Sequence, residues 1–207
     1  EILIGLVGSE MCIRDRPQRM IEIDKRFNET FRFGGNKMSS HFKRQPEWKF
    51  IVTYRKFQAN ADNVLGVYYR WQLTRIERQT GIHIENNPNI GKGLIIGHYG
   101  RIIINGKAKF GEQIYITHGV TIGQNSTGKR KGVPEIGNRV RIGANACIVG
   151  NVRIGDDVMV APNAFVNVDV PDHSVVVGNP CVIHHKENAT KGYLGCLLYT
   201  SPSPRDR

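Results

Sequence analysis

The sequence lacks several features that would assign it to a familiar class at once. No run of about 18 apolar residues occurs, so we expect no membrane span. Only four cysteines are present among 207 residues, too few for a dense disulfide framework. Acidic residues are also scarce, with 18 Asp and Glu against 29 Lys and Arg, which gives a formal net charge of +11.

A positive balance of this size can indicate nucleic acid or a membrane surface as the partner. Here the basic residues are scattered, with one tight cluster at Lys129, Arg130 and Lys131. No nucleic-acid motif surrounds that cluster. We therefore expect neither nucleic acid nor a membrane as a partner. A solvated basic face with a site for a phosphorylated ligand is the better interpretation.

The two ends of the chain differ in character from the rest. Near the start, VGSEMCIRDR can be encoded by a DNA string whose reverse complement, shifted by one base, translates as CLLYTSPSP near the end. This relation is typical of a translated sequencing-library adapter. We expect residues 1–16 and 196–207 to be adapter-derived rather than native. Cys147 and Cys181 then remain, and two thiols without metal-ligand spacing fit a reducing, cytoplasmic setting.

Helical spacing of large apolar residues marks the segment between Pro46 and Gly81. It predicts two helices, broken near residues 60–63 and stopped by Gly81. Before Pro46 the chain is polar and weakly patterned, with FGGNKMSSH as a candidate flexible joint. We assign residues 17–80 to a short α-helical N-terminal region.

After Gly81 the apolar spacing changes to six. The longest unbroken register contains Ile136, Ile142, Ile148, Ile154, Val160 and Val166, and earlier blocks contain Ile84, Ile90, Ile96, Phe110, Ile116 and Ile122. Neither a helix nor an alternating strand produces this spacing. Three hexads, each one short strand and a turn, can close a triangular coil whose stacking buries one aliphatic column. We predict a mainly β chain, with a parallel β-helix over residues 81–183 and an extension over 184–195.

Two steps in this register are too long, and extra residues cannot fit inside a filled prism. The step from Ile96 to Ile104 is eight, and the step from Ile122 to Ile136 is fourteen. The longer one contains QNSTGKRKGVP, whose polar, glycine-rich and basic character predicts a protruding loop. The shorter one contains HYGR, so we expect it to turn His98 outward.

Three stretches then carry a resemblance to a family: GIHIENNPNIGKGLIIGHYGRIIING, ITHGVTIGQNSTGKRKGVPEIG and IGANACIVGNVRIGDDVMVAPNAFVNVDVP. They resemble the serine acetyltransferases and the related hexapeptide O-acetyltransferases of surface-sugar gene clusters. The resemblance implies a left-handed β-helix, a homotrimer, and acetyl transfer from acetyl-CoA to a hydroxyl without a metal. The acceptor it implies is serine, in cysteine biosynthesis, or alternatively a sugar hydroxyl of a surface polysaccharide precursor.

The same resemblance implies roles for individual residues. His98 aligns with the catalytic base, and an imidazole with a pKa near ~6.5 can accept a proton near neutral pH. Backbone N–H groups near Gly123 are candidate oxyanion donors. The expected contacts to CoA are small residues on the coil edge and basic side chains for the phosphates: Gly123, Ala144, Ala161, Lys129 and Lys131.

Substrate contacts are harder to assign. The family carries aspartates at the positions of Gly97 and His83, and a histidine where Val133 stands. Their absence leaves few groups to hold a zwitterion, which keeps the sugar acceptor open. His83 itself, Glu85 as a replacement carboxylate, and the outward-pointing His118 are the candidate substrate-binding residues.

Two functions of other classes also stay open. The γ-type carbonic anhydrases share this fold and hold zinc with three histidines, for which His83 and His118 offer two ligands and position 123 no third. A non-catalytic scaffold is the other alternative, because solenoids present broad surfaces. Outward apolar residues such as Met159 and Phe165 would suit a partner surface in either case.

Overall fold

The computed structural model describes residues 2–85 and 88–194, with side chains from residue 17 onward. Within these residues four helices precede the strands: α1 (Ile2–Phe31), α2 (Ser40–Lys43), α3 (Pro46–Asn60) and α4 (Val64–Thr80). The predicted tail at 196–207 lies outside the described residues. None of the described helices is long and apolar enough to cross a membrane.

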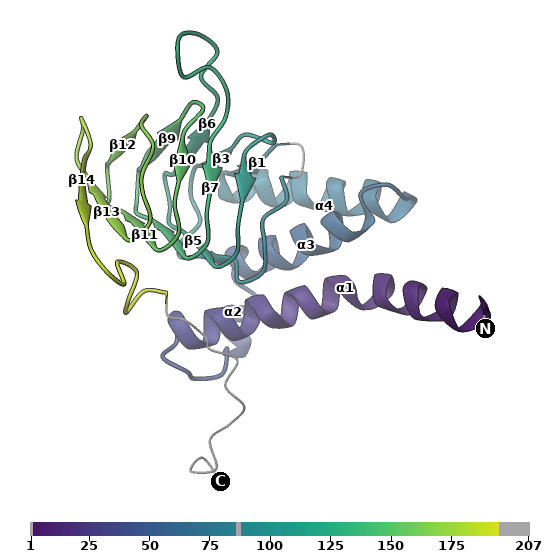
Figure 1. Cartoon of the computed structure of the whole chain (residues 1–207). Helices are drawn as coiled ribbons and strands as arrows, with labels where there is room; N and C mark the ends of the chain where they lie inside the picture. The colour runs from purple at the N-terminus through teal and green to yellow at the C-terminus, as the bar shows by residue number, and fades with distance from the viewer. Residues whose placement is uncertain (1, 86–87, 195–207) are drawn as a thin grey trace.

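Helices α3 and α4 are the pair that the apolar spacing predicts, and they pack side by side (Figure 1). The Asn63 side chain caps α4 by accepting hydrogen bonds from the N–H groups of Leu65 and Gly66. Gly81 ends α4 in the left-handed region, with φ of 71°, and donates its N–H to the carbonyl of Glu77. The predicted break and stop are therefore confirmed.

Helix α1 and the segment after it carry little apolar pattern. In FGGNKMSSH residues 34–37 are exposed and outside any helix, whereas Met38 is 4% exposed and Ser39 caps α2. The α1 helix runs through Phe31, although the chain there is weakly patterned. Its buried face explains this result, since Asp24 and Asn28 are both 0% exposed and polar. Apolar periodicity cannot reveal a helix that buries polar side chains.

The strands lie in three sheets. Sheet A contains β1 (Ile82–Ile84), β3 (Ile102–Ile104), β6 (Thr121–Gly123), β9 (Cys147–Val149) and β12 (Phe165–Val166). Sheet B contains β2 (Ile95–Ile96), β5 (Ile114–Ile116), β8 (Val140–Ile142), β11 (Val158–Val160), β13 (Ser174–Val177) and β14 (Val182–His185). Sheet C contains β4 (Lys109–Phe110), β7 (Glu135–Ile136) and β10 (Arg153–Ile154). These strands pair in parallel, except that β14 is antiparallel to β13.

The chain visits the three sheets in turn, and each strand pairs with the strand one coil later, so it winds as a three-sided parallel coil (Figure 1). The predicted six-residue register is confirmed by burial. Ile122, Ile148 and Val166 are each 0% exposed, and Phe110 is the one partly buried member of the series. The helices cover the end of the coil at which β1 and β2 lie.

One corner of the coil shows why small residues follow the aliphatic ones. At the turn after sheet C, the side-chain oxygen of each Asn or Asp accepts the backbone N–H of the coil before it: Asn138 from Glu112, Asp156 from Asn138, and Asp172 from Asp156. A Cβ on Gly137 would lie 2.5 Å from Asp156 Oδ1. Glycine is required there because this oxygen fills the place of a side chain.

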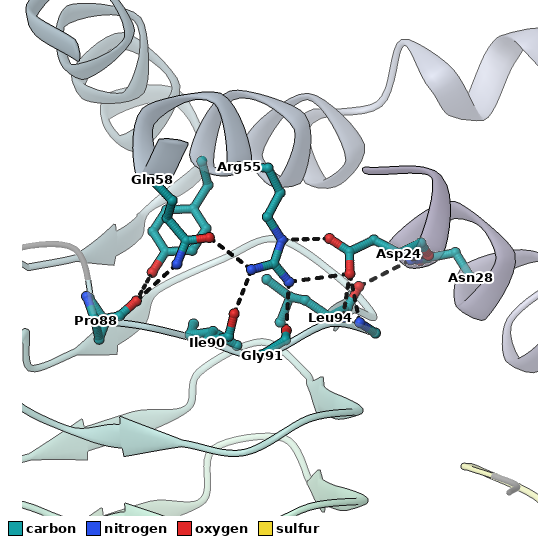
Figure 2. A network of polar contacts seen from close by, with 10 residues as sticks. Asp24, Asn28, Arg55, Gln58, Pro88, Ile90, Gly91 and Leu94 are labelled. Atoms are coloured by element: carbon teal, nitrogen blue, oxygen red, sulfur yellow. Dashed lines mark hydrogen bonds and ion pairs between the residues drawn. The ribbon is translucent and has the colours of Figure 1, made fainter. Parts of the chain in front are cut away.

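A buried ion pair joins α1 and α3 to the first coil, as Figure 2 shows. The Asp24 carboxylate accepts hydrogen bonds from Arg55 Nε at 2.7 Å and from the N–H groups of Gly93 and Leu94 at 2.7 and 2.9 Å. Arg55 also donates to the carbonyls of residues 90 and 91. Burial raises the pKa of Asp24, against the opposing effect of Arg55 and the two N–H donors.

We expect Asp24→Asn to lower the free energy of unfolding by about 3–5 kcal/mol, because it leaves the Arg55 guanidinium buried without a counter-charge. Urea unfolding followed by circular dichroism measures the change. Asp24→Asn/Arg55→Gln, which removes both charges, should lose less than the single variant. Glu22→Gln, at a side chain that is 54% exposed, is the control and should cost less than about 1 kcal/mol. Equal losses for Asp24→Asn and Glu22→Gln would contradict the role of the pair.

Candidate functional site

The turns that lead from sheet B to sheet A stack into one edge of the coil. We call this the His98 edge, and it comprises residues 97–101, 117–120, 143–146 and 161–164. Backbone hydrogen bonds join each turn to the next, from Gly119 to Gly100 at 2.9 Å, from Asn145 to His118 at 3.0 Å and from Asn163 to Ala144 at 2.8 Å. Side chains on this edge therefore hold fixed positions relative to one another.

His98 lies in the first of these turns and is exposed. The turn takes up the two extra residues of the eight-residue step, with Gly100 and Arg101 at φ of 123° and 38°. The chain enters it from β2, where the Gly97 N–H donates to the carbonyl of Ile116 at 2.8 Å. The predicted outward placement of the imidazole is confirmed.

His118 lies one coil later on the same edge and is also exposed. The two imidazole centroids are 6.2 Å apart, with the rings inclined by 66°. Carboxylates pair instead with other histidines, namely His83, His173 and His185. The edge thus presents two adjacent imidazoles, and imidazole is the side chain that can take up or release a proton near neutral pH.

His83 and Glu85 lie apart from this edge. His83 is exposed on the outer face of sheet A, in β1, and Glu85 is exposed in the turn that follows β1. His83 Nδ1 is 3.5 Å from a Glu77 carboxylate oxygen, and Glu85 accepts a hydrogen bond from Asn105 at 3.2 Å. Within one chain, the structure does not bring these two predicted substrate contacts to His98.

The residues predicted to contact CoA divide between two edges. Ala144 and Ala161 lie on the His98 edge, one and two coils beyond His118. Gly123 ends β6, so it lies at the opposite side of sheet A, where the chain leaves for sheet C. The oxyanion prediction requires backbone N–H groups near Gly123 to face His98. Within one chain they do not face it.

The predicted loop follows Gly123, and we call residues 124–134 the protruding loop (Figure 1). It is closed by two hydrogen bonds between Asn125 and Gly132, both 2.9 Å. Arg130 fixes it to the coil, with Nη1 at 2.7 Å from an Asp169 carboxylate oxygen. Lys129 and Lys131 are exposed on either side of this anchor.

A tyrosine fills the space beside the residue that precedes His98. A Cβ placed on Gly97 would lie 2.9 Å from Tyr115 Oη. Tyr115 belongs to β5, and its ring lies 5.3 Å from the guanidinium of Arg141. A larger side chain at position 97 would require this phenol to move.

The outer face of sheet A carries a column of mostly apolar side chains. Ile103, Thr121, Cys147 and Phe165 occupy paired positions on β3, β6, β9 and β12. Ile103 is 43% exposed. Burial raises the pKa of the Cys147 thiol, which disfavours the thiolate that a nucleophilic cysteine needs. Met159, predicted to lie with Phe165 on a partner surface, lies on sheet B instead.

The outer face of sheet B is covered by residues 186–194, which we call the C-terminal segment. Tyr193 stacks on Arg141 at 4.0 Å, and Leu194 is 2% exposed beside Phe27 and Ile95. Sequence reasoning did not anticipate this docking. Residues 189–194 read ATKGYL, a short mixture of polar and apolar residues without a period that could have signalled it.

A second histidine site, at His173, holds the C-terminal segment. His173 Nδ1 lies 2.9 Å from an Asp157 carboxylate oxygen. The Asp157 carboxylate also accepts hydrogen bonds from the N–H of Ala189 at 2.9 Å, and from the N–H and hydroxyl of Thr190 at 3.1 and 2.6 Å. This histidine–aspartate pair was missed from the sequence, and its contacts are those of a structural clamp.

No three side chains among His, Cys, Asp and Glu lie close enough to share one metal ion in residues 2–85 and 88–194. His83 and His118, the two predicted candidates for such a site, lie on sheet A and on the His98 edge respectively.

Comparisons with known proteins agree with this geometry. Residues 134–167 match the family described as bacterial transferase hexapeptide (six repeats). A serine acetyltransferase of Helicobacter pylori is 43% identical over 102 residues, or 48% of this chain and 58% of that protein. One of Staphylococcus aureus is 40% identical over 135 residues, or 64% of this chain and 61% of that protein. The predicted resemblance to serine acetyltransferases is confirmed.

Comparison with solved structures gives the same result. The matches include the crystal structure of Neisseria gonorrhoeae serine acetyltransferase in complex with serine. That structure matches with a TM-score of 0.70 and 27% identity, covering 81% of this chain and 69% of the other. The chain spans 58% and 61% of the Helicobacter and Staphylococcus proteins, less than two thirds of either.

The clamp at His173 predicts a pH dependence of stability. Its hydrogen bond to Asp157 raises the pKa of His173, with Glu187 and Asp172 adding to the effect. Burial works to raise the pKa of Asp157, but hydrogen bonds from Thr190, His173 and the backbone together lower it. The histidine contribution is present below about pH 6.5 and is lost as pH rises, and the aspartate contribution is present above about pH 3.9 and is lost as pH falls.

We therefore expect the melting temperature to fall between about pH 6 and about pH 8.5, and His173→Gln to flatten this dependence. Differential scanning calorimetry at both pH values measures it. His184→Gln, at an exposed histidine on β14, is the matched control and should keep the wild-type dependence. Identical pH profiles for the wild type and His173→Gln would contradict the clamp.

Proposed function

We propose that the chain is an acetyl-CoA-dependent O-acetyltransferase of the serine acetyltransferase type, with His98 as its general base. The observation that carries the proposal is the exposed imidazole on a rigid coil edge, in a chain whose relatives are serine acetyltransferases. We propose further that the coil is left-handed. A cytoplasmic setting, with serine feeding cysteine biosynthesis, fits the two unpaired cysteines, Cys147 and Cys181.

In the proposed reaction His98 accepts the proton of the acceptor hydroxyl. The oxygen attacks the thioester carbonyl of acetyl-CoA, the carbon–sulfur bond breaks, and the proton passes from the imidazolium to the departing thiolate. His118, 6.2 Å away between ring centroids, would contact the acceptor in this proposal. General base catalysis of this kind typically contributes ~10² to 10⁴ in rate.

The division of the predicted CoA residues between two edges supports a site shared by neighbouring subunits. Ala144 and Ala161 continue the His98 edge, whereas Lys129 and Lys131 extend from the far side of sheet A. The two sets can meet if the protruding loop of one subunit reaches the His98 edge of the next. We therefore propose a homotrimer in which Lys129 and Lys131 bind the CoA phosphates across the interface.

Serine is the acceptor that the relatives favour, and a sugar hydroxyl of a surface polysaccharide precursor is the second candidate. The packing at Gly97 is the reason to test the second as well. A Cβ at position 97 would lie 2.9 Å from Tyr115 Oη, so a carboxylate before His98 would require the phenol to move. A site without that carboxylate has one group fewer to bind the ammonium of an amino acid, and a neutral sugar needs no such group.

We expect thiol release from acetyl-CoA with serine or a sugar acceptor, and a loss of about 10² to 10⁴ in kcat for His98→Ala. Release is followed with a thiol reagent over a panel of serine, homoserine and sugar acceptors. His184→Ala controls for removal of an exposed histidine elsewhere. Wild-type protein that releases no thiol with any acceptor, while binding a partner protein, would favour the scaffold alternative.

We expect Ile103→Glu to separate the subunits, because it places a charge in the apolar column of sheet A that the trimer would bury. Light scattering at micromolar protein should change from a trimer mass to a monomer mass, with activity lost in parallel. Val182→Glu is the matched control, at an aliphatic residue that is 53% exposed on β14. A monomeric wild type with full activity would rule out the shared site.

A further inference from the structure

Strand β2, which leads into His98, lies at the edge of sheet B. On one side it pairs with β5, with Ile95 opposite Tyr115 and Ile96 opposite Ile116. Its other side has no neighbouring strand in the order of sheet B. Backbone N–H and C=O groups on such an edge need other partners, since unpaired buried polar groups cost free energy.

Helix α1 and the residue that follows it supply those partners. Asp24 and Asn28 lie on α1, and Arg32 comes directly after its last residue, Phe31. The three are spaced four residues apart, and the Arg32 N–H donates to the Asn28 carbonyl at 2.9 Å, so they lie above one another. The Asp24 carboxylate accepts the N–H groups of Gly93 and Leu94, and Asn28 Nδ2 donates to the carbonyl of Leu94 at 3.2 Å. Figure 2 shows Asp24 and Asn28 beside Leu94.

Arg32 makes the contact closest to His98. Its Nη1 donates to the carbonyl of Ile96 at 2.7 Å. The same peptide unit carries the Gly97 N–H, which donates to the Ile116 carbonyl at 2.8 Å. Both polar atoms of the peptide that joins Ile96 to Gly97 are therefore held, one by Arg32 and one by the next coil. The imidazole follows one residue later.

Arg32 is itself rigidly placed. Its side chain is 17% exposed, with the guanidinium 4.5 Å from the centre of the Phe42 ring. Its Nη2 lies 3.6 Å from an oxygen of Glu47, whose side chain is 6% exposed. A guanidinium fixed by a ring and a buried carboxylate can fix in turn the carbonyl to which it donates.

We propose that Arg32 is a positioning residue for the His98 turn. By holding the carbonyl of Ile96 it sets the direction in which the chain enters the turn, and so keeps the imidazole in place for proton transfer. This inference rests on the proposed function, in which His98 is the base. The helical region would then contribute to catalysis without touching either substrate.

The test needs a variant that removes the hydrogen bond without leaving a buried charge alone. Arg32→Met/Glu47→Gln does so, because it removes both members of the pair and keeps an apolar chain against Phe42. Glu47→Gln alone keeps the bond to Ile96 and is the reference. Arg26→Met is the second control, at an exposed arginine on the opposite side of α1 by the helical period.

We expect the double variant to fold and to have kcat about 10- to 100-fold below that of Glu47→Gln, with the KM for acetyl-CoA changed by less than about twofold. We also expect faster hydrogen exchange at the Gly97 amide, a readout that does not depend on activity. Arg26→Met should match the wild type in both. If methionine disturbs the packing at Phe42, Arg32→Gln in the Glu47→Gln background gives the same comparison.

Unchanged kcat and unchanged Gly97 exchange in the folded double variant would overturn the role of Arg32. A lower kcat with a KM for acetyl-CoA raised well above twofold and a lower melting temperature would indicate a purely structural residue and would also overturn it. If the wild type and Glu47→Gln both transfer no acetyl group, the proposed function fails instead, and the exchange rate at Gly97 still decides whether Arg32 holds the turn.

Discussion

The spacing of one inward aliphatic residue in every six is the constraint on which the rest of the structure depends. A three-sided coil has room inside for one such side chain per short strand, and each backbone N–H and C=O pairs with the next coil. Corner residues must then stack in register. His98, His118 and Ala144 lie on one edge because the buried column beneath them leaves no other arrangement. Extra residues have no interior to enter, so they form the turn at 97–101 and the protruding loop.

A coil built this way has two open ends, and the chain closes them by different means. At the last coil, β14 pairs antiparallel with β13, and the C-terminal segment binds Asp157 and then crosses the outer face of sheet B to Arg141 and Ile95. At the first coil, polar side chains of α1 and of Arg32, directly after it, replace the missing strand beside β2. At the first coil, therefore, the end of the coil is held by hydrogen bonds from a separate helical region. That end is also where His98 lies.

The coil could be predicted from the sequence because its signal is local and repeated. Each hexad reports the same buried position, so Ile136 to Val166 identify the fold without knowledge of distant contacts. Helix α1 gives no such signal. Asp24 and Arg55 read as surface residues, and they become buried only through each other, 31 residues apart, and through the backbone at Gly93, 69 residues from Asp24. Asp157 is likewise buried by a segment more than 30 residues later.

The outward placement of His98 could be predicted, but the division of the candidate residues between edges could not. Successive turns of a three-sided coil lie on three different edges in rotation. Two residues predicted for one site can therefore lie on opposite sides of one sheet. His98 and Gly123 do so, with sheet A between them. Side chains on these two edges are kept apart within one chain by the width of sheet A. They can approach one another only between two chains, when sheet A of one chain faces an edge of the other. The geometry of the single chain therefore already limits how a site that uses both His98 and the protruding loop can be assembled.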